Sequence, residues 1–265
     1  METGSGSLPG RKKHKMYHFF IEPEQVTEQE VVITGNDVNH IKNVLRMKAG
    51  EEVLISDGAG LDMHCQITEI TSDEIRCQIL DTAVARSEPP VKFYLFQGLP
   101  KSDKLEHIIQ KSVELGVYEI IPVETIRSVV RYDAKKQKSK QERWQKIAES
   151  AAKQSNRGII PEVKEILRLD DALKYAKQID ESGLDLILIP YENYKDMKAT
   201  KEVIETIRPG MRVGIFIGPE GGFDPSEVEK AMHASAVPIS LGNRILRTET
   251  APLMLLSVLT FALEA

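Results

Sequence analysis

A glycine-rich segment near the C-terminus has the residue types that bind a polar ligand. Gly218-Pro219-Glu220-Gly221-Gly222 follows the apolar run at residues 213–217. Glycines and a proline let the backbone approach a ligand closely, and N–H groups at the start of the next helix can bind its polar atoms. A plain strand-to-helix turn explains two of these residues but not all of them. The segment therefore favours a binding loop, with Asp224, Pro225 and Glu227 as the N-cap, first position and capping box of the helix.

A second segment, residues 239–251, carries two arginines that could act on an anion. Arg244 and Arg247 lie just before a predicted helix, with Thr248 as its expected N-cap. Cations at the positive end of a helix dipole are unfavourable unless an anion lies there. The guanidinium fork fits a phosphate, a carboxylate or a developing negative charge. An exposed surface without a ligand is the alternative.

A third, weaker indication is the apolar run at residues 184–189, which leads directly into Pro190, Tyr191 and Glu192. Several other site types are not indicated. The glycine segment lacks the G-x-G-x-x-G spacing, and no G-x-x-x-x-G-K sequence is present. The histidines are scattered, and no His, Cys, Asp and Glu set has metal spacing. The sequence therefore predicts neither a dinucleotide fingerprint, nor a P-loop, nor a metal site.

The elements that must position these segments alternate between strand and helix after residue 90. Alternation of this kind predicts an α/β fold, a parallel sheet with helices on both faces. Ligands bind beyond the carboxyl ends of such strands, so the three segments are expected to meet there. The expected strands are 91–99, 118–123, one near 163, 184–189, 213–217 and 238–241. The expected helices are 101–115, 138–155, 169–176, 194–207, 225–232 and a buried C-terminal helix.

Residues 16–88 have a different pattern of short alternating apolar runs. Runs at 31–33, 53–55, 63–70 and 75–80, separated by turn residues, predict a small antiparallel barrel or sandwich. One helix, capped by Asn36 or Asp37 and ending at Gly50, interrupts them. Residues 86–90 read as a linker because of Pro89 and Pro90. Residues 1–15 are Gly/Ser-rich and then basic, and we interpret them as an added leader or a disordered arm.

The charge distribution gives mixed indications about nucleic acid. The whole chain has a net charge of −5; without the four Lys/Arg and one Glu of residues 1–15 it has −8. Residues 127–157 carry ten Lys/Arg and three acids, whereas residues 16–88 carry five basic and fourteen acidic residues. A basic excess usually accompanies RNA binding, although a solvated helix face would also explain the basic segment. Two cysteines and no long apolar span indicate a reduced, cytoplasmic protein without a membrane segment.

The motifs together resemble the RsmE family of ribosomal-RNA uridine-N3 methyltransferases, within the SPOUT class. The resemblance lies chiefly in the run from Gly218 to Phe223 and in Leu241-Gly242 followed by the run from Arg244 to Ala251. Weaker matches are residues 100–106, 111–117, 127–128, 143–144 and 154–157, and His40 with residues 44–46 and Gly50. Residues 16–265 are covered.

The resemblance implies a PUA-like RNA-binding barrel at 16–88 and a methyltransferase domain at 89–265 with a trefoil knot. It implies a homodimer acting on small-subunit (16S) ribosomal RNA, in an assembled or nearly assembled subunit, without a metal. The implied S-adenosylmethionine-binding residues are Leu188, Pro190, Glu192, Ile217, Gly218, Pro219, Glu220, Gly222, Leu241, Gly242, Ile245, Leu246, Thr250 and Ala251. The implied RNA-binding residues are His40, Arg46, Lys101, Lys104, Arg127, Arg131 and Arg157.

Uridine N3 carries a weakly acidic proton, so its methylation requires a base or stabilisation of the developing anion. Arg247 and Arg244 are the candidates for stabilisation, and Glu249 or Glu220 for the base. For Glu249, a structural role in the first turn of the helix is the alternative. Two other classes stay open: a small-molecule enzyme or nucleotide binder that uses the same loop, and a non-catalytic RNA-binding or assembly protein.

Overall fold

The computed structural model describes residues 16–264 and divides into two compact units. The smaller unit contains residues up to Asp57 and Leu61–Ala83. The larger contains Gly58–Gly60 and the chain from Val84 onward. The predicted leader or arm, residues 1–15, lies outside the described residues. Among residues 16–264, no helix combines the length and the apolar character needed to cross a membrane.

The smaller unit is a five-stranded sheet in the order β1-β3-β4-β5-β2. Its strands are β1 (Tyr17–Phe20), β2 (Glu30–Thr34), β3 (Glu52–Ser56), β4 (Leu61–Ile70) and β5 (Glu74–Val84). The four predicted runs lie in β2 to β5. The prediction missed β1 and was wrong to expect a wholly antiparallel sheet, because β1 pairs parallel to β3, with Tyr17 opposite Val53. Inward residues such as Val31, Val53 and Ile75 are fully buried, as alternation requires.

The predicted helix of the smaller unit is present but differs at both ends. A short α1 (Asn36–Asn39) continues into a π-helical segment, η2 (His40–Leu45). Gly35 occupies the N-cap without a side-chain bond, so the expected cap at Asn36 or Asp37 is wrong. The helix ends at Arg46, which adopts left-handed backbone angles (φ 56°), and not at Gly50. A second short segment, η1 (Pro23–Gln25), precedes β2.

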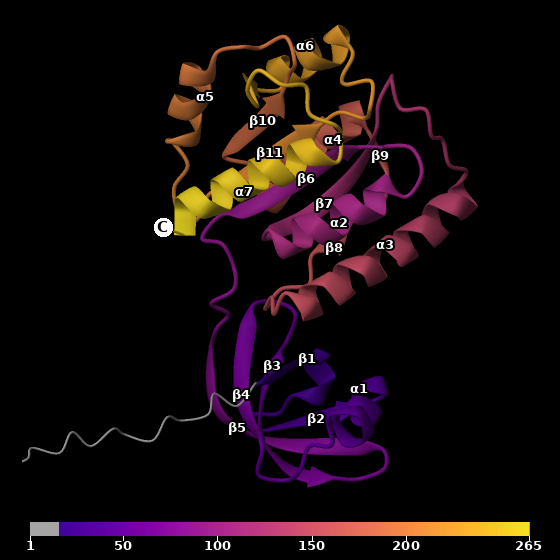
Figure 1. Cartoon of the computed structure of the whole chain (residues 1–265), viewed down its shortest axis with the longest axis vertical. Helices are drawn as coiled ribbons and strands as arrows, with labels where there is room; N and C mark the ends of the chain where they lie inside the picture. Colours follow the sequence, from indigo (N-terminus) through magenta and orange to yellow (C-terminus); the bar gives the residue numbers. More distant parts are fainter. Residues whose placement is uncertain (1–15, 265) are drawn as a thin grey trace, which may run out of the picture. The chain divides into compact units, whose positions relative to one another are not determined.

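The larger unit contains the predicted parallel sheet, in the order β12-β10-β11-β6-β7-β8 with β9 also paired to β7 (Figure 1). Its strands are β6 (Lys92–Gly98), β7 (Val117–Glu124), β8 (Glu162–Val163), β9 (Leu167–Arg168), β10 (Leu186–Pro190), β11 (Arg212–Ile217) and β12 (Ala236–Ile239). Neighbouring strands pair in parallel register. β6 is central, between β11 and β7, and the last strand ends two residues earlier than predicted.

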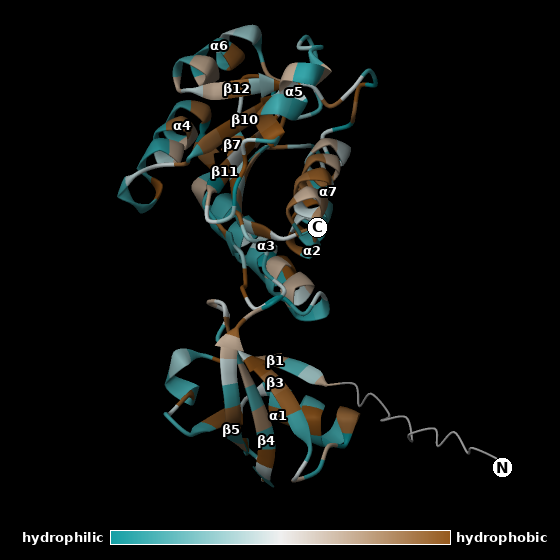
Figure 2. Cartoon of the chain, turned by 90° about the vertical axis from the view of Figure 1, so that its left-hand side faces the viewer, coloured by the Kyte–Doolittle hydropathy of each residue, from teal (hydrophilic) through white to brown (hydrophobic). Residues whose placement is uncertain are grey.

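Helices cover both faces of this sheet, as predicted (Figure 2). α4 and α6 pack on one face, α2 and α7 on the other, and α3 packs against α2. The bounds are α2 (Lys104–Glu114), α3 (Ala134–Gln154), α4 (Leu169–Gln178), η3 (Ile179–Glu181), α5 (Met197–Ile204), α6 (Pro225–His233) and α7 (Thr250–Glu264). α3 starts four residues before the predicted position because Asp133 caps it, accepting the Lys136 N–H.

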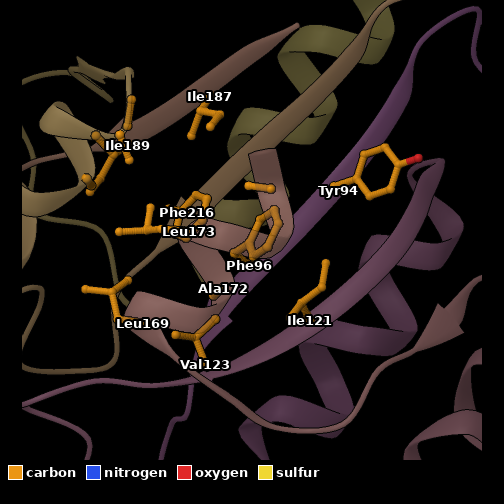
Figure 3. Packing of buried hydrophobic residues seen from close by; sticks show 14 of the residues in the cluster. Tyr94, Phe96, Ile121, Val123, Leu169, Ala172, Leu173, Ile187, Ile189 and Phe216 are labelled. Carbon is orange, nitrogen blue, oxygen red and sulfur yellow. The ribbon is translucent and has the colours of Figure 1, made fainter. Parts of the chain in front are cut away.

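The α4/α6 face contains one apolar core of the larger unit (Figure 3). Phe96 of β6 and Phe216 of β11 stack with ring centroids 4.1 Å apart. Alternate residues of the neighbouring strands, such as Ile121 and Ile189, pack around them with Leu173 of α4. This packing fixes the strands, and therefore their carboxyl ends, relative to one another.

Candidate functional site

The loops after three neighbouring strands surround one pocket. β10, β11 and β12 end at Pro190, Ile217 and Ile239, and the residues that follow each strand line the pocket. The pocket contains about 830 Å³ of space outside protein atoms, solvent at its mouth included. The three segments selected from the sequence therefore meet, as a parallel sheet requires.

The loop after β11 makes a tight turn that needs glycine. A Cβ atom on Gly218 would lie 2.9 Å from the carbonyl carbon of Gly222, and Gly222 has φ +66°. The predicted start of α6 is confirmed. Asp224 is the N-cap, Pro225 follows it, and Glu227 returns a bond to the Asp224 N–H at 2.9 Å. Local sequence thus fixes the exit of the loop.

Contacts from a distant loop brace this turn. Arg127, after β7, donates from Nη1 to the Gly221 carbonyl (2.9 Å) and lies 3.4 Å from the Asp224 carboxylate. The buried Glu227 carboxylate also accepts the Ile126 N–H at 2.7 Å. The loop after β11 is therefore held from both sides by charged side chains.

The segment after β12 forms the opposite wall of the pocket. Leu241, Gly242, Arg244, Ile245 and Leu246 line it, and Ile245 is 83% exposed. The prediction that the Thr248 hydroxyl caps the next helix is wrong. Thr248 Oγ1 donates to the Gly218 carbonyl at 2.7 Å, across to the other wall.

Three charged residues meet beside the pocket. The Lys104 ammonium lies 3.1 Å from Glu220 Oε1 and 3.2 Å from Glu249 Oε2, and the Lys101 N–H also donates to Glu220. Partial burial alone would raise the pKa of Glu220 and of Glu249, but backbone N–H groups and Lys104 outweigh it. Both pKa values therefore lie below the ordinary value. The two carboxylates raise the pKa of Lys104 in turn. Both glutamates are thus weaker bases than a free carboxylate.

The candidate catalytic residues lie around this cluster. Glu249 is 22% exposed and sits directly before α7. The Arg247 side chain is 81% exposed, and its Nη1 lies 4.0 Å from Glu249 Oε1. Arg244 lines the pocket and forms no hydrogen bond or ion pair with any residue that the structure describes. Both guanidinium groups are therefore open to a ligand.

Most predicted cofactor residues line the pocket. Those that do are Pro190, Glu192, Ile217, Gly218, Pro219, Glu220, Gly222, Leu241, Gly242, Ile245, Leu246 and Ala251. Leu188 and Thr250 do not. Leu188 is fully buried inside β10, and Thr250 is exposed at the start of α7. Lining residues absent from the prediction are Tyr191, Tyr194, Lys195, Phe223, Ser240 and Thr248. The sequence could have indicated these residues, because they lie next to the motifs in the chain.

The predicted RNA-binding residues occupy several environments. His40, Arg46 and Lys101 are exposed, and Arg131 is half-exposed and paired with Glu124. Lys104 instead pairs with Glu220 and Glu249, and Arg127 contacts Gly221 and Asp224. Arg157 is a correction: it is 3% exposed and donates to Glu88 and to the carbonyls of Val113 and Val117. A guanidinium so enclosed does not fit an RNA-contacting role.

Comparisons with known proteins agree with this geometry. A family model described as an RNA methyltransferase domain matches residues 87–260, and one described as an RNA methyltransferase PUA domain matches residues 33–80. The ribosomal RNA small subunit methyltransferase E of Bacillus subtilis is 37% identical, over 94% of this chain and 98% of that protein. The chain belongs to the RsmE family of RNA methyltransferases.

Other members of the RsmE family extend the match. The Synechocystis protein of the same name is 30% identical over 98% of this chain and 84% of its own. A crystal structure of the Neisseria gonorrhoeae enzyme, bound to S-adenosyl methionine, superposes with a TM-score of 0.75 at 31% identity. It covers 93% of this chain and 98% of its own. The family resemblance predicted from the motifs is thus confirmed. The PUA-like unit and the α/β methyltransferase unit are confirmed as well. The trefoil knot stays a prediction.

Proposed function

We propose that this protein transfers the methyl group of S-adenosylmethionine to N3 of one uridine in small-subunit ribosomal RNA. One observation carries the proposal. In a chain of the RsmE family, the loops after three adjacent strands close around one pocket that Arg244 lines, and the exposed Arg247 follows in the same segment. A pocket that binds a small polar ligand, next to cations that can face an anion, suits transfer to a nucleotide.

The pocket residues fit S-adenosylmethionine. Apolar side chains such as Ile217, Leu241 and Leu246 can pack on a purine, while the carboxylates of Glu192 and Glu220 can accept bonds from its polar groups. Gly218, Pro219 and Gly222 of this turn line the pocket, so a polar ligand can approach their backbone closely. When bound, the sulfonium supplies an activated methyl group. The chain's own task is to orient the uracil and to manage the N3 proton.

Arg244 and Arg247 are proposed to stabilise the negative charge that develops on the uracil. Arg244 lines the pocket, and Arg247 is 81% exposed with only a 4.0 Å ion pair to Glu249. Glu249 or Glu220 is proposed to accept the proton. Because Lys104 and backbone N–H groups keep both pKa values low, either glutamate would act best if RNA binding drew Lys104 away. The base proposal would be abandoned if Glu249→Gln and Glu220→Gln both kept near-normal turnover and cofactor affinity.

RNA is proposed to contact both units, each through its own basic residues. In the smaller unit the exposed cations Lys42, Arg46 and Lys48 lie within and just after η2, with exposed His40. Arg76 of β5 is instead neutralised by Glu30, Glu69 and Glu74. The proposed RNA contact of this unit is therefore at η2. In the larger unit, Lys101 and the outward face of α3 would bind phosphates.

A homodimer is proposed on the outer face of α7. Met254, Val258 and Phe261 recur at helical spacing and are 36%, 41% and 78% exposed. An exposed apolar stripe of this kind commonly marks a protein interface. Phe261→Asp is expected to convert the dimer to a monomer, because it places a charge at the most exposed residue of the stripe. Light scattering after size-exclusion chromatography measures this, and an unchanged mass would refute the interface.

The decisive experiment uses radiolabelled S-adenosylmethionine and small ribosomal subunits that lack the native modification, with free rRNA in parallel. Label recovered as N3-methyluridine at one position supports the proposal. The expected site of action is the cytoplasm, where ribosomes assemble. Cofactor binding without transfer to subunits or rRNA would favour a binding or assembly role. Transfer to a small molecule without RNA would favour a small-molecule enzyme that uses the same loop.

A further inference from the structure

The strand beneath the pocket carries a buried amide among apolar residues. Gln97 is the second-last residue of β6 and is fully buried. Tyr94 and Phe96 point into the α4/α6 core, so alternation places Gln97 on the α2/α7 face with Phe93 and Leu95. A glutamine in such a position needs a reason beyond packing.

The amide belongs to a chain of hydrogen bonds that reaches both walls of the pocket. Gln97 Nε2 donates to Thr248 Oγ1 at 3.0 Å and to the Gly98 carbonyl at 3.1 Å. Thr248 Oγ1 in turn donates to the Gly218 carbonyl at 2.7 Å. The Thr248 hydroxyl has one proton, which it donates to the Gly218 carbonyl, so towards Gln97 it can only accept. A reversed amide would place its oxygen against two acceptors.

These hydrogen bonds connect segments that are remote in sequence. Gly218 opens the loop after β11, and Thr248 ends the segment after β12; both line the pocket, whereas Gln97 does not. The backbone of β6 also approaches the loop after β11 closely there, since a Cβ on Gly98 would lie 2.7 Å from Pro219 Cδ. The two walls are therefore tied to the central strand at one point.

The amide is only half satisfied. Gln97 Oε1 is buried and has no hydrogen-bond partner in the described part of the chain. A buried acceptor left unpaired is unfavourable, and an apolar side chain of similar size would avoid it. For fold stability alone, methionine would serve at least as well as glutamine.

We infer that Gln97 is a positioning residue, which sets the separation of the two pocket walls through Thr248 and thereby the affinity for S-adenosylmethionine. The inference rests on the proposed function, in which this pocket binds that cofactor. It assigns Gln97 no contact with the cofactor, because the side chain is sealed beneath the pocket.

The test measures cofactor affinity by calorimetry and thermal stability in the same variants of the full chain. Gln97→Met is expected to weaken binding about fivefold, in line with loss of one neutral hydrogen bond, while Tm stays unchanged or rises. Thr248→Val should weaken binding at least as much, and Thr248→Ser, which keeps the hydroxyl, should restore it. Because the two residues act in one chain, the double variant Gln97→Met/Thr248→Val should bind no worse than Thr248→Val.

A matched control is Ser112→Ala on α2, which also removes a buried, unpartnered polar atom but one outside the pocket lining. It should leave affinity unchanged. Wild-type affinity in Gln97→Met would overturn the inference, as would a loss of affinity that merely parallels a fall in Tm. Failure of the wild-type chain to bind S-adenosylmethionine would instead overturn the proposed function.

Discussion

The two walls of the pocket are held very differently. The loop from Gly218 to Asp224 is fastened by Arg127, Glu227, Thr248 and Lys104, all from other elements or its own helix. The segment from Leu241 to Arg247 has few such bonds, and the side chains of Ile245 and Arg247 project into solvent. A fastened wall suits a cofactor that binds the same way in every turnover. An open wall with exposed arginines suits a large substrate that must arrive and leave.

The largest expected effect concerns the fastened wall. Gly218→Ala should remove measurable S-adenosylmethionine binding and destabilise the fold by about 1–3 kcal/mol, because its Cβ would meet the Gly222 backbone at 2.9 Å. Calorimetry and thermal unfolding measure the two effects. Asn243→Ala, an exposed position in the open wall, is the control and should change neither. Normal binding by Gly218→Ala would show that the loop is not the rigid part of the site.

Arg247→Ala tests the open wall. Methyl transfer should fall about hundredfold, the usual effect of removing one group that stabilises transition-state charge. Cofactor affinity and Tm should stay near wild type, because the side chain is 81% exposed and only weakly paired. Single-turnover transfer to small subunits measures the rate. Equal loss of cofactor affinity would place Arg247 in the cofactor site and not opposite the RNA.

Arg127→Ala separates two roles for one arginine. If Arg127 braces the loop, cofactor affinity should fall about two- to fivefold, as expected for partly exposed charged hydrogen bonds, with little change in KM for RNA. Arg127→Lys keeps the charge but not the two-pronged contact, so it should resemble alanine. A change confined to the KM for RNA would instead restore the sequence-based RNA assignment.

The smallest effect is a pH dependence at the junction between the walls. Glu220 and Glu249 have pKa values below the ordinary 4.5 in the folded chain. They therefore stabilise the fold above that value, and this contribution is lost as the pH falls through their lowered pKa values. Lys104→Met should make the Tm fall less between neutral pH and pH about 3. A fall as steep as in wild type would mean that Lys104 contributes little to the lowered pKa values.

The sequence by itself predicted those features that depend on neighbouring residues. The turn into α6 is one: Asp224, Pro225 and Glu227 form the cap locally, and the capping box is present. The meeting of the three loops is another, since parallel strands place their carboxyl ends at one edge. The alternation of strands and helices likewise determined the sheet and the helices on both its faces.

Only the tertiary structure decided features that join distant residues. Arg157 looked like a surface cation by its composition, yet it is buried by Glu88, 69 positions earlier. Thr248 looked like a cap, but Gly218 and Gln97 use its hydroxyl, 30 and 151 positions away. Lys104 looked free for phosphate until Glu220 and Glu249 came within reach. The sequence shows which side chains can form hydrogen bonds, but their partners depend on packing, which brings remote segments within hydrogen-bonding distance.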